Sequence, residues 1–340
     1  MTGNSTATYR NASLLSIVDV EAPRVVTSEE LENRLDDVLR RLKLPHGLLQ
    51  RLAGVRARRM WDHPEDYLQG AAQAGRQALA QAGITPDQVG LLINTSVTRT
   101  HLEPAVSVVV HDKMGLPSSA MNFDITNACL GFVNGMGLAA TMIDSGQVDY
   151  VVVVAGEDAS KVHEATVENL NHEATNRDAF LSQFATLTLG SGAAAAVIGP
   201  SDRHPEGHRI LHSVTRAGTE FNHLCAGDHK GMSTDSAALL ANGLDLVMAA
   251  WNDADPAWKW SEADRYITHQ VSSQHTNAII QAAGIDPDKI PVTFPDLGNI
   301  GHAALPVTLA REKDKLSPGD SVLCMGVGSG LNVAMLDLQW

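Results

Sequence analysis

The chain has 340 residues, of which 44% are hydrophobic, so it can bury a core large enough for one large α/β domain or two similar halves. Acidic residues outnumber basic ones by 39 to 25, and the net charge of −14 argues against nucleic acid or an anionic membrane surface as a partner. Three scattered cysteines, no signal peptide and no apolar run of membrane-spanning length predict a cytoplasmic protein with reduced thiols. No HExxH or clustered ligand pattern occurs in the sequence, so we expect no metal.

Strand and helix patterns alternate along the first part of the chain. The alternation over residues 13–20 predicts a strand. Helices are predicted for residues 27–42, which begin with a capping box, and for residues 65–83, which end at a glycine. Residues 90–96 read as a buried strand, and residues 148–155 are a nearly continuous β-branched run, as is typical of a strand covered on both faces. These patterns predict an α/β fold.

Four arginines gather between the first two predicted helices. They are Arg51, Arg56, Arg58 and Arg59, and Trp61 follows them. Any one of these arginines could simply lie on the solvated surface of the protein. Together, however, Arg56, Arg58, Arg59 and Trp61 could hold a phosphate-bearing carrier, because guanidinium groups bind phosphate through paired hydrogen bonds.

Cys129 lies at a junction between a loop and a predicted helix. The short run that ends at Phe123 is followed by this loop, and residues 130–143 read as a buried helix closed by Gly146. The N-terminus of a helix favours a thiolate, so we expect the pKa of this thiol to be lowered. A buried structural role is the usual alternative for an isolated cysteine.

The chain after residue 160 separates into an insertion and a second half. Residues 160–185 are polar and charged and read as a helical insertion lying over the core, and the Pro- and Gly-rich loop 200–208 is a natural boundary. We therefore divide the chain into an N-terminal half, residues 1–200, and a C-terminal half, residues 201–340.

The C-terminal half repeats the pattern of the N-terminal half. A predicted helix over 236–251 precedes a predicted strand over 266–271, as the helix 65–83 precedes the strand that starts at residue 90. The apolar run 321–327 matches the run that ends at residue 155. Two copies of one βα pattern predict a duplicated architecture.

Polar residues in the C-terminal half lie at positions where ligand sites commonly form in α/β folds. His269 falls at a strand end, the usual place for sites in open α/β sheets, and Asn299 lies in a loop whose glycines let backbone approach a ligand. Considered alone, the histidine could be a buried core residue whose hydrogen bonds are satisfied, and the asparagine could be a turn residue. The tail loop with Gly328, Ser329 and Gly330 could aim a backbone N–H at an oxyanion, with the N–H of Cys129 as second donor.

At these residues the sequence resembles the thiolase superfamily over most of its length. The motifs that stand in the order used by the 3-oxoacyl synthase III group are Asn127-Ala-Cys-Leu-Gly131, Thr268-His-Gln270, Gly298-Asn-Ile-Gly301 and Gly328-Ser-Gly-Leu331. Three further segments are most similar to OleA-type acyl-CoA condensing enzymes of long-chain olefin biosynthesis, whose relatives make β-lactones: Ile93-Asn-Thr-Ser96, Leu102-Glu-Pro104 and Gly190-Ser-Gly-Ala-Ala194.

The resemblance implies a five-layer αβαβα fold with two duplicated halves, and a dimer with itself or with a paralogue. It implies that Cys129 takes an acyl group from coenzyme A, and that His269 and Asn299 stabilise the enolate and polarise thioester carbonyls. Glu103 matches a loop glutamate that acts as base in the partner subunit's site. CoA thioesters are then substrates, no cofactor is required, and a reductase and a β-lactone synthetase would act downstream. His302 stands where a smaller, non-titrating residue is expected, which bears on the polarity of that loop.

Three functions fit these residues. The first is non-decarboxylative Claisen condensation of two long-chain acyl-CoAs to a 2-alkyl-3-oxo acid or its thioester. The second is a decarboxylating 3-oxoacyl synthase that uses an acyl-CoA primer and a malonyl carrier. Glu103 favours the first, because an unactivated α-carbon must lose a proton to a base. The third, a catalytically idle subunit, is disfavoured because nothing structural requires Cys129, His269 and Asn299 together.

Overall fold

The computed structural model describes residues 5–228 and 230–340. Within these ranges a ten-stranded mixed sheet has the order β12-β13-β14-β9-β2-β8-β7-β5-β6, with β1 paired to β9. Its strands are β1 (Thr6–Thr8), β2 (Ala12–Glu21), β5 (Leu91–Asn94), β6 (Met121–Asp124), β7 (Val151–Glu157), β8 (Gly192–Pro200), β9 (His208–Ala217), β12 (Arg265–Thr268), β13 (Ser321–Gly328) and β14 (Asn332–Gln339). Two small antiparallel pairs are separate from it: β3 (Arg24–Thr27) with β4 (Ala57–Met60), and β10 (Cys225–Asp228) with β11 (Gly231–Thr234).

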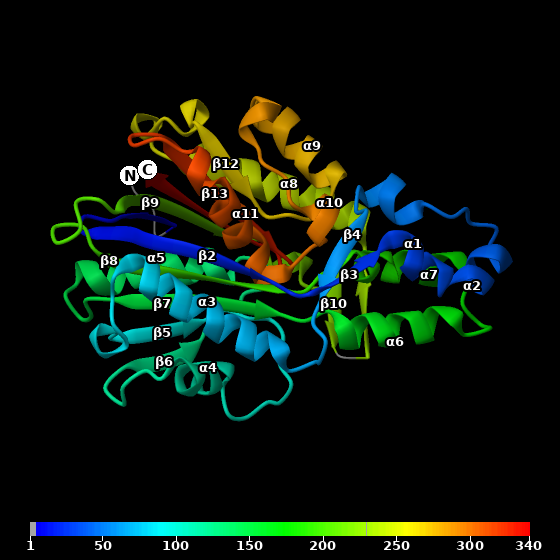
Figure 1. Ribbon diagram of the computed structural model, residues 1–340. Helices are drawn as coiled ribbons and strands as arrows, with labels where there is room; N and C mark the ends of the chain where they lie inside the picture. Colours follow the sequence, from blue (N-terminus) through cyan, green and yellow to red (C-terminus); the bar gives the residue numbers. More distant parts are fainter. Residues whose placement is uncertain (1–4, 229) are drawn as a thin grey trace.

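Helices cover the outer faces of the sheet, and further helices lie between its N-terminal strands and its C-terminal strands (Figure 1). They are α1 (Ser28–Asn33), α2 (Asp36–Arg41), α3 (Asp66–Ala82), α4 (Val106–Met114), α5 (Gly131–Asp144), α6 (Ser160–Asn171), α7 (Arg177–Gln183), α8 (Ser236–Asp253), α9 (Ser273–Ala283), α10 (Phe294–Leu297) and α11 (Ala304–Glu312). In Figure 1 the pair α8 and α9 lies on one outer side of the sheet and the pair α3 and α4 on the other.

The alternation of side chains along the strands explains the layers. In β7, Val151 and Val153 join the core cluster that contains α5 and α11, whereas Val152 and Val154 join the cluster that contains α3 and α4. A strand buried on both faces must be apolar at successive positions, as this one is. The C-terminal strands β13 and β14 likewise pack on α5 and α11 with one face and on α8 and α9 with the other. The five layers are therefore α, β, α, β, α, as expected.

The two halves repeat one order of elements. In the first, α3 precedes β5 and α5 precedes β7; in the second, α8 precedes β12 and α11 precedes β13. Cys129 stands just before α5, and Asn299 stands just before α11. Corresponding loops of the two repeats therefore carry the two candidate site residues. The repeat is incomplete, because the described residues between α9 and α11 contain no strand that corresponds to β6.

A group of small elements caps one end of the molecule. The helices α1, α2, α6 and α7 and the β10–β11 hairpin lie together at the right of Figure 1. The four helices share a core that includes Leu31, Leu35, Val167, Leu170 and Phe180. The helix expected over 27–42 is in fact two helices with a break at residues 34 and 35. The helical insertion expected near 160–185 corresponds to α6 and α7.

Candidate active site

A single pocket brings together the candidate residues from the two halves. Its volume is about 620 Å³, and its wall includes Cys129, His269, Asn299, Gly328 and Ser329. Most of the remaining wall is apolar and comes from α8, α9 and the cap, including Val162, Leu189, Met232, Leu239, Leu244, Val247 and Ile279. Ligand sites of this size are commonly apolar with a few placed polar groups, and this pocket fits that description.

The turn that carries Cys129 is held in an unusual backbone conformation. Ala128 has a φ of 42°, a region that L-residues seldom adopt outside functional sites. Side-chain hydrogen bonds on both sides fix this turn: Asn127 Nδ2 donates to Asn134 Oδ1 at 2.8 Å, and Asn332 Nδ2 donates to Asn127 Oδ1 at 3.0 Å. The thiol is thereby placed at the start of α5, facing the pocket.

The thiol of Cys129 is not activated in the way the helix position alone predicted. Burial raises its pKa to about 12, and the charge of Glu157 adds to the increase. The expected lowering of this pKa was therefore wrong, because desolvation and a nearby carboxylate outweigh the helix N-terminus. The cysteine is protonated before a substrate enters.

His269 follows the end of β12, where its backbone N–H donates to Met325 O at 2.9 Å. Burial, with a smaller effect of His275, lowers the pKa of its imidazole to about 3, so the ring is neutral. Its Nδ1 atom is buried and has no hydrogen-bond partner. Nε2 is thus the ring nitrogen that remains for a substrate in the pocket.

Asn299 is held by the chain on its other side. Its N–H donates to Thr188 O, and its carbonyl accepts from the N–H of Gly190, both at 2.9 Å. This contact requires glycine at 190, since a β-carbon there would lie 2.0 Å from Leu297 O. The side-chain Oδ1 accepts from the N–H of Gly301 at 3.0 Å, which leaves the amide NH₂ free to donate into the pocket.

The tail loop reaches the cysteine through its first two residues. Gly328 and Ser329 line the pocket, and a β-carbon at Gly328 would lie 2.8 Å from the amide nitrogen of Cys129. Gly330, the third residue predicted for this role, is not part of the pocket wall. The close approach of Gly328 keeps two backbone segments together beside the thiol, as an oxyanion site requires.

Glu103 lies outside the pocket of its own chain. The residues of its loop that do line the pocket are Val97, Thr98, Arg99, Thr100 and Leu102. Glu103 itself is exposed, and the neighbouring Leu102 is 92% exposed. The loop therefore begins in the pocket and then turns its tip outward.

The arginines predicted to bind a carrier do not share one surface. Arg56 is exposed and pairs with Asp296 at 2.7 Å, three residues before Asn299. Arg58 is fully buried, and its guanidinium donates to Ser28 Oγ and Leu187 O. Trp61 is also buried and donates to the carbonyl of Glu157 at 2.8 Å. Neither Arg58 nor Trp61 is in a position to contact a carrier at the surface.

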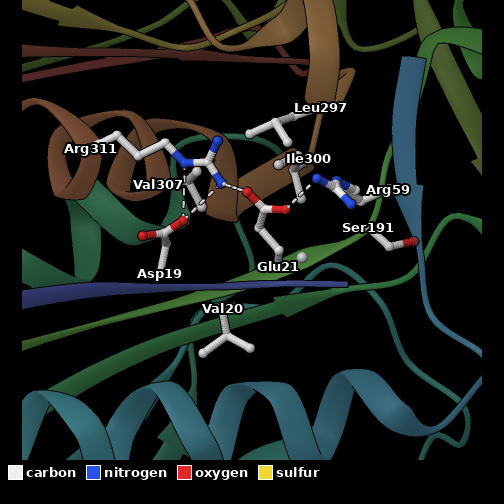
Figure 2. A pocket seen from close by; sticks show the side chains of 10 residues that line it. Asp19, Val20, Glu21, Arg59, Ser191, Leu297, Ile300, Val307 and Arg311 are labelled. Carbon is white, nitrogen blue, oxygen red and sulfur yellow. Dashed lines mark hydrogen bonds and ion pairs between the residues drawn. The ribbon is translucent and has the colours of Figure 1, made fainter. Parts of the chain in front are cut away.

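Arg59 belongs to a separate cluster of charges (Figure 2). It pairs with Glu21 at 2.7 Å, and Arg311 bridges Glu21 and Asp19 at 2.5 and 3.0 Å. The small hollow beside them, about 10 Å³, is lined by none of the Cys129, His269 and Asn299 group. The charges in this cluster largely satisfy one another, which accounts for the position of Arg59 without a ligand.

Sequence analysis missed Glu157, a buried acidic residue in the wall of the pocket. It is 5% exposed and ends strand β7. Burial raises its pKa to about 7 despite the hydrogen bonds that it accepts. The only sequence signal was a glutamate at the end of an apolar strand, where loops usually begin.

His302 turns out to be neutral and enclosed. Burial and, secondarily, His269 lower its pKa to about 3, and both ring nitrogens lack a hydrogen-bond partner. Its ring occupies the space beside Gly131, where a β-carbon would lie 2.3 Å from Cε1. This histidine therefore adds no charge to the Asn299 loop.

Residues 5–228 and 230–340 contain neither a metal-binding cluster nor a membrane-spanning helix. No group of three or more His, Cys, Asp or Glu side chains is arranged to hold a metal ion. No helix in these ranges has the length and apolar character needed to cross a membrane.

A five-layer fold with a cysteine, a histidine and an asparagine in one apolar pocket defines a thiolase-like acyltransferase. Two family models match: 3-oxoacyl-[acyl-carrier-protein] synthase III over residues 123–218, and the C-terminal region of that synthase over residues 254–340. Acyl-CoA:acyl-CoA alkyltransferase of Xanthomonas campestris is 40% identical, covering 98% of this chain and 99% of its own. Its counterpart of Shewanella oneidensis is 32% identical over 98% and 99%. The β-ketoacyl-[acyl-carrier-protein] synthase III of Symbiobacterium thermophilum is 28% identical over 93% and 94%.

Solved structures of OleA superpose closely on this chain. OleA of Xanthomonas campestris bound to cerulenin superposes with a TM-score of 0.95 at 39% identity, covering 98% of each chain. A structure of a cysteine variant of that OleA holds lauric acid and lauroyl-CoA, with the same TM-score and identity, over 98% of this chain and 100% of that one. Other structures of it replace a histidine or a glutamate. The chain belongs to the OleA family of acyl-CoA:acyl-CoA alkyltransferases, within the 3-oxoacyl-[acyl-carrier-protein] synthase III group.

Proposed function

We propose that this enzyme joins two long-chain acyl-CoAs by a Claisen condensation without decarboxylation, through an acyl group carried on Cys129. The observation that carries the proposal is the pocket of about 620 Å³, which combines the thiol, two neutral hydrogen-bonding groups and a long apolar wall. An alkyl chain fits such a wall because its transfer from water is favourable. The relatives with this activity are also more similar to the chain than the synthases that use a carrier protein.

In the first step the sulfur of Cys129 attacks the thioester carbonyl of one acyl-CoA. A thioester to Cys129 forms, the bond to the CoA sulfur breaks, and the thiol proton leaves with CoA. The negative charge that develops on the carbonyl oxygen would be stabilised by the N–H of Cys129 and by the adjoining Gly328–Ser329 backbone. Because the resting thiol is protonated, this proton must be transferred in the course of the attack, and it ends on the departing CoA sulfur.

In the second step a base removes an α-proton from another acyl-CoA. The resulting carbanion attacks the acyl carbonyl on Cys129, a carbon–carbon bond forms, and the cysteine sulfur departs. The product is a 2-alkyl-3-oxoacyl-CoA, which hydrolysis converts to the acid. His269 Nε2 and the NH₂ of Asn299 would stabilise the enolate oxygen as neutral donors, in line with the low pKa of His269.

We assign the base to Glu103 acting in the partner subunit's site. The assignment is supported by its exposure and by its absence from the pocket wall of its own chain. It is also supported by the replacement of a glutamate in structures of the related OleA. A decarboxylating synthase would need no such base, because loss of CO₂ generates the carbanion directly.

A dimer through β6 would bring Glu103 to a second site. The strand β6 lies at the edge of the sheet, where its backbone can pair with another chain. Exposed large apolar side chains gather on the same segment: Val97, Leu102, Val108 and Met121. Such a patch beside a free edge is typical of an interface. The partner is a second copy of this chain or a paralogue.

The product and the CoA group set two further expectations. A 3-oxo product with a free carboxylate or thioester is a substrate for a ketone reductase, and the resulting hydroxy acid for a β-lactone synthetase.

Of the arginines predicted to hold CoA, Arg56 is the one we retain, since it is exposed near the Asn299 loop. It would bind phosphate by exchanging its contact with Asp296.

The test is one incubation of the purified protein with lauroyl-CoA alone, followed by mass spectrometry of the products and of the protein. We expect acyl-Cys129 and a condensed 2-alkyl-3-oxo product, neither of which Cys129→Ala should form. Cys225→Ala serves as the matched control, since Cys225 also lines the pocket but precedes no helix. Condensation that occurs only after a malonyl carrier is added would favour the decarboxylating alternative.

A further inference from the structure

The loop that carries Glu103 is attached at its root to a buried carboxylate. Glu157 Oε1 accepts from the N–H of Val97 at 2.8 Å, and Oε2 accepts from the N–H and the hydroxyl of Thr98 at 3.1 and 2.7 Å. Thr98 Oγ1 in turn accepts from the N–H of Asp158 at 3.0 Å. Glu157 and the N–H of Asp158 thus fix Val97 and Thr98, the third and fourth residues after β5, and these two residues are the root of the loop, which ends five residues before Glu103.

The same carboxylate touches the loop that carries Asn299. The backbone N–H of His302 donates to it, and a β-carbon at Gly301 would lie 3.3 Å from Glu157 Cδ. Trp61 Nε1 donates to the Glu157 carbonyl at 2.8 Å, which holds the residue from behind. Glu157 therefore joins the root of one loop to the residues that follow Asn299.

The rest of the Glu103 loop is held by other groups. Arg99 donates to Thr126 Oγ1 at 2.6 Å, and Asp124 accepts from the N–H groups of Val106 and Ser107 at 3.0 and 2.8 Å. These contacts fix the middle of the loop and the start of α4. At the root, Glu157 accepts three hydrogen bonds from Val97 and Thr98, and the N–H of Asp158 adds a fourth contact to Thr98.

We infer that Glu157 is a positioning residue for the condensation step, which sets the place of Glu103 relative to Asn299 and the acyl group on Cys129. The inference rests on the proposed function. Glu157 is not itself the base, because four donors already occupy its two oxygen atoms. A base must reach its proton in a near-attack geometry, so a shift of about 1 Å in the loop can cost about 100-fold in rate.

Two substitutions separate this role from a structural one. Glu157→Gln exchanges one acceptor oxygen for an NH₂ group and breaks part of the bonding to the root. Thr98→Val keeps the shape but removes the hydroxyl, and with it the contacts to Glu157 and to the N–H of Asp158, whereas Thr98→Ser keeps the hydroxyl. Glu164→Gln is the matched control, since Glu164 lies on α6, pairs with Arg34 at the surface and is absent from the pocket.

The experiment measures, for each variant, the rate of acyl transfer from lauroyl-CoA to Cys129 and the rate of condensation. We expect Glu157→Gln to acylate within about threefold of the parent and to condense about 10- to 100-fold more slowly. Thr98→Val should share the defect, and Thr98→Ser and Glu164→Gln should be normal. Unchanged condensation in either folded root variant would overturn the inference, and so would a parallel loss of acylation and condensation.

Failure of the proposed function gives a different result. If the parent enzyme forms acyl-Cys129 but never condenses two acyl groups, the function is wrong whatever the variants do. If the parent condenses and Thr98→Val condenses equally well, only the role of Glu157 is wrong. Because Thr98→Val alters no charge, it decides the question even where Glu157→Gln fails to fold.

Discussion

Gly328 and Cys129 approach so closely that the backbone of one excludes a side chain on the other. A β-carbon at Gly328 would lie 2.8 Å from the amide nitrogen of Cys129 and 2.8 Å from the β-carbon of Ala128. Real β-carbons do not approach backbone atoms this closely, so the turn around the thiol must move to accept one. The C-terminal tail loop thus constrains the backbone of the turn that carries Cys129.

Gly328→Ala should therefore impair the first chemical step. We expect acylation of Cys129 to fall by about 10²–10³, which is the usual cost of losing one oxyanion donor. Rapid quenching and mass spectrometry of the protein measure this rate. Gly243→Ala is the control, because the nearest atom to a β-carbon there is 3.9 Å away. Normal acylation by Gly328→Ala would show that the tail loop does not shape the oxyanion site.

His269 and Asn299 should matter more for the second step than for the first. Both present neutral donors to the pocket, and an enolate oxygen carries more negative charge than the thioester carbonyl from which it forms. We expect His269→Ala and Asn299→Ala to slow condensation by about 10²–10³ each and to slow acylation less. Single-turnover measurements separate the two rates. Variants that condense at the parent rate once acylated would remove both residues from this role.

The reactivity of Cys129 should depend steeply on pH. The pKa of its thiol is raised to about 12, so the thiolate fraction grows about tenfold for each pH unit below that value. We expect the rate of alkylation by iodoacetamide, followed at Cys129 by peptide mapping, to rise without a plateau up to about pH 9. Glu157→Gln should react faster above about pH 7, where the Glu157 carboxylate is ionised and its negative charge opposes the thiolate. A plateau near neutral pH would mean that the helix N-terminus dominates.

The sequence predicted the elements of this fold better than their local chemistry. The apolar run that became β7 is long and β-branched, so burial on both faces could be read from it. The order of the motifs placed Cys129, His269 and Asn299, and the pocket brings them together. The pKa of the thiol could not be read in this way, because it depends first on burial in the folded pocket and then on Glu157, which is 28 residues away in the chain.

The arginine cluster illustrates the same limit. Arg58 and Arg59 are successive residues of β4, so their side chains point to opposite faces, and Arg56 lies just before the strand. One is therefore exposed, one is buried, and one enters an ion-pair cluster. Proximity in sequence overstated their proximity in space. Glu157 was overlooked because a single glutamate belongs to no recognisable sequence pattern.

Glu103 offers a test of action between subunits. Glu103→Ala should acylate Cys129 normally and fail to condense, because only the α-proton transfer needs the base. Mixing Glu103→Ala with Cys129→Ala protein should restore condensation in heterodimers, since one of their two sites then has both groups. Differently tagged chains allow the heterodimers to be purified and assayed. Heterodimers that stay inactive would exclude action in trans.

The most direct test of the whole account is the condensation of lauroyl-CoA deuterated at both α-positions. If the enzyme removes an α-proton from an unactivated acyl-CoA, breaking the carbon–deuterium bond slows that step. We predict a primary kinetic isotope effect on condensation and none on acylation of Cys129, measured in the same single-turnover experiment. Condensation at the same rate with both substrates, in an experiment where chemistry limits the rate, would contradict proton abstraction as the source of the nucleophile.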